Sequence, residues 1–375
     1  MPENCDVLIA GLGAMGSSAA FHCARRGWKV IGLDRFSPPH NLGSSHGQTR
    51  IIREAYYEHP AYVPLVQQAY HLWDELEKLS SDRLFQETGG LMIGPETGPL
   101  FSGSLLSARQ HGLDYEVLSA NDLHNRHPGI HPPRNALAVW EPRAGILFPE
   151  KCIAAHLKLA REHGASLKLE EPILNWEPVS NGVRVRTEKS EYFAGRMILC
   201  AGSWMPVLLG RFSLRLQVER QILFWFNNRQ PALFQPESFP VFLLEHAPEQ
   251  FFYGFPDLGN GVKIAQHHEG EPTTPETVPR EVSRNETTFM QNLVAPFLPD
   301  LTDPIGSTVC MYTNTASGHF LLDFHPEAPS VLVASPCSGH GFKFSSALGE
   351  IMANLIGDGE TRFDLSLFRL AAHRS

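Results

Sequence analysis

A glycine-rich turn between an apolar strand and a helix, close to the amino terminus, constrains the fold more than any other feature of this sequence. The apolar run CDVLIA is followed by GLGAMG, which carries Gly11, Gly13 and Gly16, and the next strand, KVIGLD, ends at Asp34. The glycines permit a tight turn, a close approach of pyrophosphate to the backbone, and close packing of helix on strand. Asp34 can accept hydrogen bonds from a ribose diol. The pattern predicts a dinucleotide-binding domain and leaves open whether the dinucleotide is FAD or NAD.

The segment SPCSGHGFKFSSALGEIMANLIG near the carboxyl end predicts a second ligand-binding loop, followed by an amphipathic helix that stops at Gly357. The buried face of the helix is predicted from apolar residues at three- and four-residue spacing: Leu348, Ile351, Met352 and Leu355. Gly339 and Gly341 let the backbone approach a ligand, while Lys343 and the free amides of the first turn favour an anion such as a reduced flavin. The alternative is a strand, loop and helix in which Lys343 is merely solvated.

Composition excludes several classes of partner. The net charge is -9 without a lysine or arginine run, so nucleic acid and anionic membrane surfaces are not expected partners. No apolar stretch is long enough to span a bilayer, and the chain enters a strand at once, which predicts a cytoplasmic protein. The six scattered cysteines form no CxxC pair and the histidines no HExxH motif, so neither a disulfide framework nor a metal site is expected.

The order of strand patterns predicts two domains in this chain of 375 residues. Nucleotide-binding character occurs in three pieces, residues 1–85, 146–215 and 306–375. Between them lie residues 86–145, which are polar and punctuated by proline, and residues 216–305, with alternating runs such as LQVERQILFWF. The expected fold class is therefore α/β and α+β: a doubly wound nucleotide-binding domain, interrupted by an antiparallel-sheet substrate domain, with the site at their junction.

Four motifs resemble those of a known family. GSSHGQTRIIREAY, GVKIAQH, CMYTNT and SGHGFKFSS resemble the monomeric sarcosine oxidase family, which includes N-methyltryptophan oxidase and pipecolate oxidase. The resemblance implies a fold similar to that of D-amino-acid oxidase, a monomer, and a covalently bound FAD. It further implies oxidation of secondary amino acids, with dioxygen reduced to hydrogen peroxide. The alternatives are a flavin dehydrogenase that uses another acceptor, a nicotinamide-dependent dehydrogenase, and a silent nucleotide-binding protein.

Carried onto this sequence, the resemblance makes Cys310 of CMYT the attachment point of the flavin. A thiolate is the required nucleophile, and a cationic neighbourhood would favour it. Cys337, close to the glycine loop, is the rival, and a buried structural cysteine is the remaining alternative. The expected cofactor-binding residues are Gly11, Gly13, Gly16, Asp34, Arg35, Ser44, His46, Thr49, Cys310, Gly339, Gly341 and Lys343.

The resemblance also implies a substrate site. Arg53 and Lys343 would hold the substrate carboxylate, because a guanidinium forks onto a carboxylate and a lysine adds a point charge. Tyr253 and Tyr312 would line the pocket, where ring faces favour a partial positive charge on the amine. Without the resemblance, Arg53 would be expected in a solvated ion-pair network and the two tyrosines equally in the core.

Three residues are expected to serve the chemistry. Arg50 would lie beside the flavin ring, and Lys263 over it, where a fixed positive charge stabilises superoxide. Alternation along GVKIAQH places Lys263, Ala265 and His267 on one face. His267 would then contact the substrate amine, although a slip of one residue in the preceding loop would exchange it with His268.

The sequence leaves the substrate open. Residues 56–59, which in the family lie by the entrance, are bulkier here, and Ser335-Pro336-Cys337 replaces an Ala-Gly-Phe type sequence. The candidates are N-methyl amino acids, cyclic imino acids and larger N-alkyl amino acids.

Overall fold

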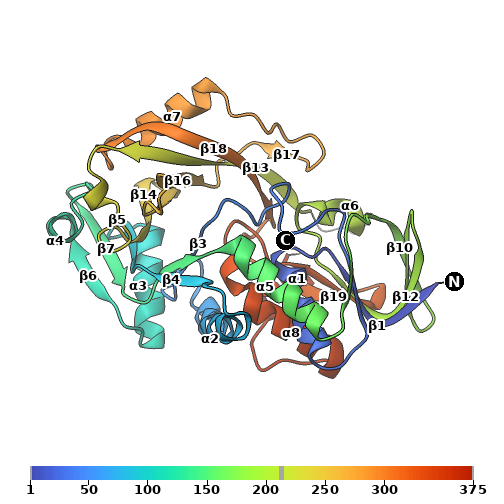
Figure 1. Ribbon diagram of the computed structural model, residues 1–375. Coiled ribbons are helices and arrows are strands. Elements are labelled where there is room, and N and C mark those ends of the chain that lie inside the picture. Colours follow the sequence, from blue (N-terminus) through green and yellow to red (C-terminus); the bar gives the residue numbers. More distant parts are fainter. Residues whose placement is uncertain (1, 211–214, 374–375) are drawn as a thin grey trace.

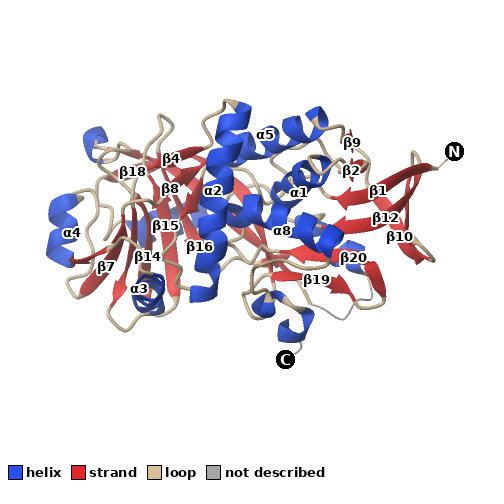
Figure 2. Ribbon diagram, turned by 90° about the horizontal axis from the view of Figure 1, so that it is seen from below, coloured by secondary structure: helices blue, strands red, loops and turns tan. Residues whose placement is uncertain are grey.

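The computed structural model describes residues 2–210 and 215–373. Figure 1 shows two large sheets in separate halves of the molecule, with long strands β13 and β18 running along the top of one half. Helices gather against the sheet of the other half (Figure 2). None of the helices in this part of the chain combines the length and the apolar character needed to cross a bilayer.

The first sheet contains both amino-terminal strands. In spatial order it comprises β10 (Ile173–Val179), β11 (Gly182–Thr187), β12 (Glu191–Leu199), β1 (Glu3–Ala10), β2 (Val30–Leu33) and β9 (Ser166–Lys168), and β20 (Ala328–Ser335) pairs with β12 and with β19 (Leu321–His325). The pairs β20–β12, β12–β1, β1–β2 and β2–β9 are parallel. The central strands β1 and β2 are largely apolar and buried, as expected where both faces of a sheet are covered.

Helices cover one face of this sheet and form the largest core. They are α1 (Ala14–Ala24), α2 (Val63–Ser80), α5 (Pro149–Glu162) and α8 (Ser345–Asp358). The predicted face of α8 is confirmed, since its four apolar residues are at most 1% exposed. The predicted stop at Gly357 is wrong: the helix continues to Asp358, and Gly359 ends it with a φ of 78°. Gly357 instead lies against the Trp28 ring, where a side chain would not fit.

The second sheet is mainly antiparallel. In spatial order it comprises β17 (Pro272–Thr273), β13 (Gln217–Asn228), β16 (Val262–His267), β15 (Gln250–Phe255), β14 (Val241–Ala247), β5 (Gly90–Pro95), β7 (Ala136–Glu141) and β6 (Glu116–Ser119), and β18 (Leu301–Asn314) pairs with β13. Its accompanying helices are α3 (Pro99–His111), α4 (Ala120–Arg126) and α7 (Arg284–Val294). The alternating runs LQVERQILFWF and GVKIAQH are the neighbouring strands β13 and β16, as expected for antiparallel partners.

A small third sheet lies where the two halves meet. It consists of β3 (Arg50–Ile52), β8 (Gly145–Leu147) and β4 (Phe85–Glu87), with β8 in the middle. Shorter helical segments are α6 (Met205–Leu209), η1 (Pro60–Tyr62), η2 (Gly202–Trp204), η3 (Pro231–Leu233), η4 (Phe342–Phe344), η5 (Ser366–Phe368) and η6 (Leu370–His373). The domain limits stay a prediction. Strand β18 crosses the expected limit at residues 305 and 306, and residues 211–214 and 374–375 lie outside the described part of the chain.

Candidate active site

A cavity of about 520 Å³ lies between the first and second sheets. Fourteen of the residues expected at the site line it: Gly11, Gly13, Asp34, Arg35, Ser44, Arg50, Arg53, Tyr253, His267, Cys310, Tyr312, Gly339, Gly341 and Lys343. They come from segments far apart in the sequence, which the fold brings together. Gly16, His46, Thr49 and Lys263 do not line the cavity.

The amino-terminal glycines form a cradle of the kind that a pyrophosphate requires. A Cβ atom on Gly16 would lie 1.7 Å from the Gly11 carbonyl oxygen, so the turn closes only with glycine, whereas the space around Gly13 is open. At the end of β2, the carboxylate of Asp34 accepts hydrogen bonds from the amides of Leu12 (2.7 Å) and Phe36 (2.8 Å). Each carboxylate oxygen retains a lone pair for a ribose hydroxyl. Burial raises the pKa of Asp34.

Arg35 bounds the same end of the cavity. Its guanidinium carbon lies 4.9 Å from the Trp204 ring centroid and 5.3 Å from that of Phe36, and it forms an ion pair with Glu276 at 3.4 Å. These contacts connect the segment after β2 with the segment after β17.

The carboxyl-terminal loop approaches the cavity closely. Gly339 has a φ of +76°, and a Cβ atom there would lie 2.6 Å from the Tyr312 ring and 3.0 Å from that of His267. A Cβ atom on Gly341 would lie 1.7 Å from the Pro336 carbonyl oxygen. Both positions therefore require glycine, one because of its backbone conformation and both because of close contacts.

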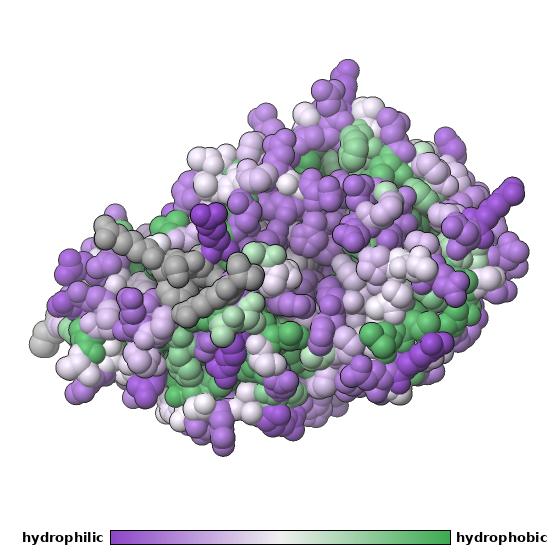
Figure 3. Space-filling view, turned by 180° about the vertical axis from the view of Figure 1, so that it is seen from behind, coloured by the Kyte–Doolittle hydropathy of each residue, from purple (hydrophilic) through white to green (hydrophobic). Residues whose placement is uncertain are grey.

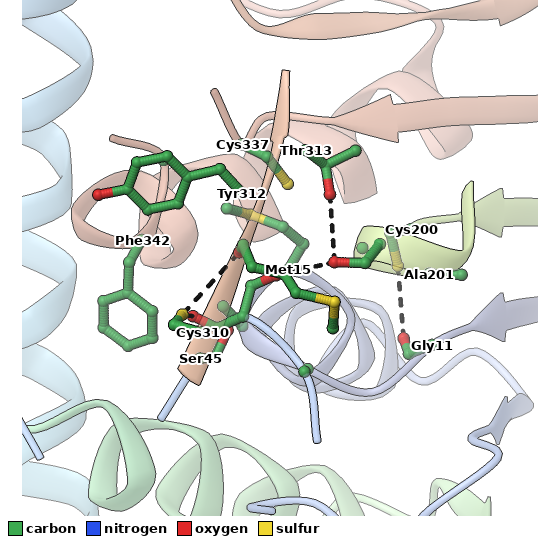
Figure 4. Close-up of a pocket in the computed structure, with 18 of the residues that line it drawn as sticks. Gly11, Met15, Ser45, Cys200, Ala201, Cys310, Tyr312, Thr313, Cys337 and Phe342 are labelled. Carbon is green, nitrogen blue, oxygen red and sulfur yellow. Dashed lines mark hydrogen bonds between the residues drawn. The ribbon is translucent and has the colours of Figure 1, made fainter. Parts of the chain in front are cut away.

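Two cysteines line the cavity in addition to Cys200. Cys310 lies on β18 and is 2% exposed, and its Sγ is 3.3 Å from the Ser44 carbonyl oxygen and 3.8 Å from Nη2 of Arg50. Figure 4 shows Cys310 and Tyr312 on the same strand, with Cys337 on a separate segment. Burial raises the pKa of Cys337 to about 11. Of the two, Cys310 is the one whose sulfur lies beside the Arg50 guanidinium.

Arg53 and Lys343 converge on one tyrosine. The Arg53 guanidinium carbon lies 4.3 Å from the Tyr56 ring centroid, and the Lys343 Nζ lies 5.2 Å from it. Lys343 Nζ also donates to the His340 carbonyl (2.8 Å) and to the Tyr56 hydroxyl (3.4 Å). Burial, and then the charge of Arg53, lowers the pKa of Lys343 to about 7. The two cations thus form a buried positive site on the cavity wall.

Glu58 belongs to the segment expected by the entrance, but its pairing with Arg53 was not predicted. It lines the cavity, and its carboxylate accepts hydrogen bonds from Arg53 at 2.8 and 3.1 Å. Burial raises the pKa of Glu58, but the charges of Arg53 and its other cationic neighbours, together with the Arg53 hydrogen bonds, lower it below its usual value. Glu58 follows Arg53 by five residues, a spacing that places two side chains together neither on a helix nor on a strand. The sequence therefore carried no periodic signal for this ion pair.

Lys263 lies behind the cavity wall. Its Nζ donates to the carbonyls of Gly47 (2.7 Å) and Thr49 (3.0 Å) and to the Thr49 hydroxyl (3.0 Å), and the residue is 2% exposed. Burial, and then the charge of Arg50, lowers its pKa well below the usual value. Three acceptors for three N–H bonds support the ammonium form against that loss of solvation.

Of the two adjacent histidines, His267 lines the cavity. Its Nδ1 lies 3.3 Å from the Tyr312 hydroxyl, and burial lowers its pKa well below the usual value, so the ring is neutral near pH 7. The side chain of His268 is 37% exposed, with Nδ1 3.7 Å from Glu219. The exchange of the two side chains is thus absent, and His267 presents a neutral ring to the cavity.

His46 is buried beside these cations. Burial, and then Arg50, lowers its pKa to about 3. Its Nε2 has no hydrogen-bond partner within residues 2–210 and 215–373. The same described ranges contain no group of three or more acids, histidines and cysteines that could hold a metal ion, and the expectation of a metal-free site stays a prediction.

A family model described as FAD dependent oxidoreductase matches residues 6–355. The chain belongs to the FAD dependent oxidoreductase family. It is 42% identical, over 381 aligned positions and 99% of both chains, to the monomeric sarcosine oxidase of Streptomyces avermitilis. It is also 32% identical to the N-methyl-L-tryptophan oxidase of Yersinia pestis (strain Pestoides F), covering 98% of this chain and 99% of that one. The family resemblance drawn from the motifs is confirmed, and FAD is the dinucleotide of this FAD-dependent oxidoreductase.

Solved structures confirm the fold class. NikD, an amino acid oxidase essential for nikkomycin biosynthesis, is 25% identical, with a TM-score of 0.85 over 98% of this chain and 97% of that one. The L-proline dehydrogenase from P. horikoshii has the same TM-score at 18% identity and the same coverage, and shows the fold alone. The glycine cradle, Asp34 and the open cavity fit an FAD-dependent oxidoreductase of this family.

Proposed function

We propose that this chain is an oxidase of secondary amino acids, N-methylated or cyclic, whose FAD is attached through Cys310. The observation that carries the proposal is the pair Arg53 and Lys343, buried over Tyr56 in the same cavity as Cys310 and a neutral His267. A guanidinium and an ammonium together stabilise a small carboxylate, and a neutral imidazole can accept a hydrogen bond from an amine. The relatives named as oxidases of sarcosine and of N-methyl-L-tryptophan support the same substrate class.

Bound FAD would supply the redox chemistry, taking two electrons and a hydrogen from the carbon next to the substrate nitrogen and delivering them to dioxygen as hydrogen peroxide. The glycine cradle and Asp34 would hold its pyrophosphate and ribose. The Cys310 thiolate would bond to the flavin 8α carbon, which would lose one hydrogen as a proton and pass an electron pair to the flavin ring, and dioxygen would then reoxidise the ring. Proximity of Sγ to the Arg50 guanidinium supports this attachment.

The protein's own part is placement and charge. Arg53 and Lys343 fix the carboxylate, so that the amine lies toward His267 and the aromatic rings of Tyr253 and Tyr312. The amine reacts in its unprotonated form, because only that nitrogen has a lone pair to give to the developing imine, and the neutral ring of His267 can accept a hydrogen bond from the amine N–H. Hydrolysis of that imine by water releases an aldehyde and a primary amine, or opens a cyclic product.

Lys263 would serve the reaction with dioxygen. Its ammonium is held by three acceptors of residues 47–49, directly before Arg50, which lines the cavity. A fixed positive charge lowers the energy of the superoxide that forms in the first electron transfer.

We also propose a cytoplasmic monomer. All six cysteines are free thiols, which supports a reducing compartment. On the face shown in Figure 3, hydrophilic side chains predominate and hydrophobic ones form separate patches. The relatives that are named monomeric sarcosine oxidase support a single chain.

The test is a panel of N-methyl, cyclic and N-alkyl amino acids added to the purified yellow enzyme without oxygen, with bleaching of the flavin band as the readout. Admission of oxygen should then restore the band, with one hydrogen peroxide per substrate consumed. Bleaching without peroxide would instead identify a dehydrogenase with another acceptor. Absence of bleaching by every secondary amine would refute the assignment.

A further inference from the structure

Two carboxylates frame the small sheet at the junction of the two halves. Strand β3 (Arg50–Ile52) pairs antiparallel with β8 (Gly145–Leu147), with Arg50 opposite Leu147 and Ile52 opposite Gly145. Because the strands run in opposite directions, the residues after β8 lie beside the turn before β3. Those before β8 lie beside the turn after β3. The segment EPRAGILFPE carries Glu141 at one end and Glu150 at the other.

Glu150 holds the turn that precedes β3. Its Oε1 accepts hydrogen bonds from the amides of Gly47 (2.8 Å) and Gln48 (3.0 Å). Both residues have positive φ, 94° and 71°, which is costly for glutamine and leaves two successive N–H groups directed at one anion. The carbonyls of this turn are the ones that accept the hydrogen bonds of Lys263. Glu150 therefore fixes the acceptors that hold the ammonium.

Glu141 holds the turn that follows β3. The carboxylate is 2% exposed and accepts the amide of Glu54 at Oε1 (2.6 Å) and that of Ala55 at Oε2 (2.8 Å). The guanidinium of Arg53 in turn donates to the Ala55 carbonyl at 2.7 Å. Glu141 lies at the end of β7, so the second sheet determines where the turn carrying Arg53 lies.

We propose that Glu141 and Glu150 are positioning residues, which act through backbone amides to place Arg53 for the substrate carboxylate and Lys263 for dioxygen. The roles of the two cations rest on the proposed function. Glu141 should therefore affect substrate binding and flavin reduction, and Glu150 should affect the reaction with dioxygen. Neither glutamate should affect the other half-reaction. A merely structural role for the two acids would lower stability without such a division.

The hydrogen-bond pattern predicts that replacement by glutamine has opposite effects at Glu150 and Glu141. Glu150 uses one oxygen for both amides, so Glu150→Gln retains the acceptor, whereas Glu150→Ala removes it. Glu141 uses both oxygens, so Glu141→Gln turns an NH₂ group toward a backbone N–H and breaks one of the two bonds. Glu77 is a matched control, because its Oε2 accepts the amides of Leu84 (2.6 Å) and Phe85 (3.0 Å), in a turn without any proposed site residue.

The first test is hydrogen exchange of the backbone amides in the flavin-containing enzyme. Exchange at Gly47 and Gln48 should rise about tenfold or more in Glu150→Ala and stay near the wild-type rate in Glu150→Gln. Exchange at Glu54 and Ala55 should rise by a similar factor in Glu141→Gln. Uniform acceleration in all variants, Glu77→Ala included, would overturn the inference.

The second test separates the half-reactions by stopped flow. Glu150→Ala should slow the reaction of the reduced enzyme with dioxygen about tenfold, with substrate-driven reduction changed less than about threefold. Glu141→Gln should weaken binding of propionate and of the amino acid about tenfold, with the oxygen reaction unchanged. Glu77→Ala should alter neither.

The outcomes distinguish the positioning role from the proposed function. Faster exchange of the Glu54 and Ala55 amides and weaker propionate binding in Glu141→Gln support the positioning of Arg53, whether or not a secondary amine is oxidised. If no secondary amine is oxidised, only the proposed function fails. If amines are oxidised but Glu141→Gln and Glu150→Ala behave like Glu77→Ala in both half-reactions, the positioning role is wrong.

Discussion

Nη2 of Arg53 donates to both carboxylate oxygens of Glu58, at 2.8 and 3.1 Å, and the two side chains are 3% and 13% exposed. A substrate carboxylate held by Arg53 needs the N–H groups of the same guanidinium. Glu58 therefore competes for the guanidinium within the enzyme, and the affinity for substrate is the difference between two similar pairings.

Replacing Glu58 should accordingly strengthen carboxylate binding. An amide at this position in Glu58→Gln accepts fewer of the Arg53 donors, so the KM is expected to fall by about threefold to tenfold while Lys343 still contributes its charge. Loss of one partner of a buried ion pair should cost about 3 kcal/mol in the free energy of unfolding. Steady-state kinetics and denaturant unfolding give the two values, and a KM that rises would contradict the competition.

Binding of a simple carboxylate should weaken as pH rises above about 7. The pKa of Lys343 is about 7 because burial and Arg53 disfavour its ammonium. A bound anion stabilises that ammonium, so the pKa rises in the complex. Affinity is then constant below pH 7 and falls by about tenfold per pH unit above it, until the pKa of the complex is reached.

Propionate is the ligand for this measurement, since it has no amine of its own that titrates in this range. Calorimetry between pH 6 and 9 should show the decline in the wild-type enzyme. In Lys343→Arg the side chain stays protonated throughout, so its affinity should not change with pH. An equal decline in both proteins would assign the effect to another group.

Cysteine replacement tests the flavin attachment. Intact mass of the denatured wild-type protein should exceed the chain mass by one FAD. Cys310→Ala should lose that increment and release its yellow colour on acid precipitation, whereas Cys337→Ala should retain both. Retention in Cys310→Ala would move the bond to Cys337 or to another residue.

Local patterns sufficed for much of the fold. GLGAMG and the apolar runs around it predicted β1, α1 and β2, since period and turn residues are set by neighbours in the sequence. The boundary between the two domains was harder to predict from the sequence. Strand β18 begins in one predicted domain and ends in the next, although it pairs with β13 along its length. The local sequence of a strand does not indicate which sheet the strand joins.

At the site, motifs predicted residues and long-range contacts determined their partners. Lys263 was expected over the flavin, whereas its Nζ is hydrogen-bonded within the turn of residues 47–49. The pairings of Glu58 and Glu141 were not predicted, because an acid that pairs with a guanidinium or with backbone amides resembles a surface acid in sequence. Only the pairing of β3 with β8 brings Glu141 to its turn.

Removal of the Lys263 ammonium should affect one half-reaction. Lys263→Met leaves two backbone carbonyls without their donor and removes the fixed charge, so reoxidation by dioxygen is expected to slow by about 100-fold or more. Anaerobic reduction by substrate should change by less than about fivefold. Stopped-flow absorbance follows both, and equal slowing of the two steps would refute the role of Lys263.

The close approach at Gly339 predicts a steric effect on the pocket. Gly339→Ala would place a methyl group 2.6 Å from the Tyr312 ring at a φ of +76°, so both stability and substrate binding should decline. Gly318→Ala is the matched control, with a φ of +73° and open space around the added carbon. Gly318→Ala should lower the free energy of unfolding by about 1 kcal/mol, because alanine disfavours a positive φ, and should leave the KM unchanged.

The location of Cys310 on β18 has a mechanical consequence. The glycine cradle belongs to the first sheet, and Cys310 belongs to the second. An FAD that is bound by the first sheet and covalently attached to the second would act as a cross-link between the two. Loss of either sheet would then loosen the other, and hinge opening of the two halves would be restrained for the lifetime of the enzyme.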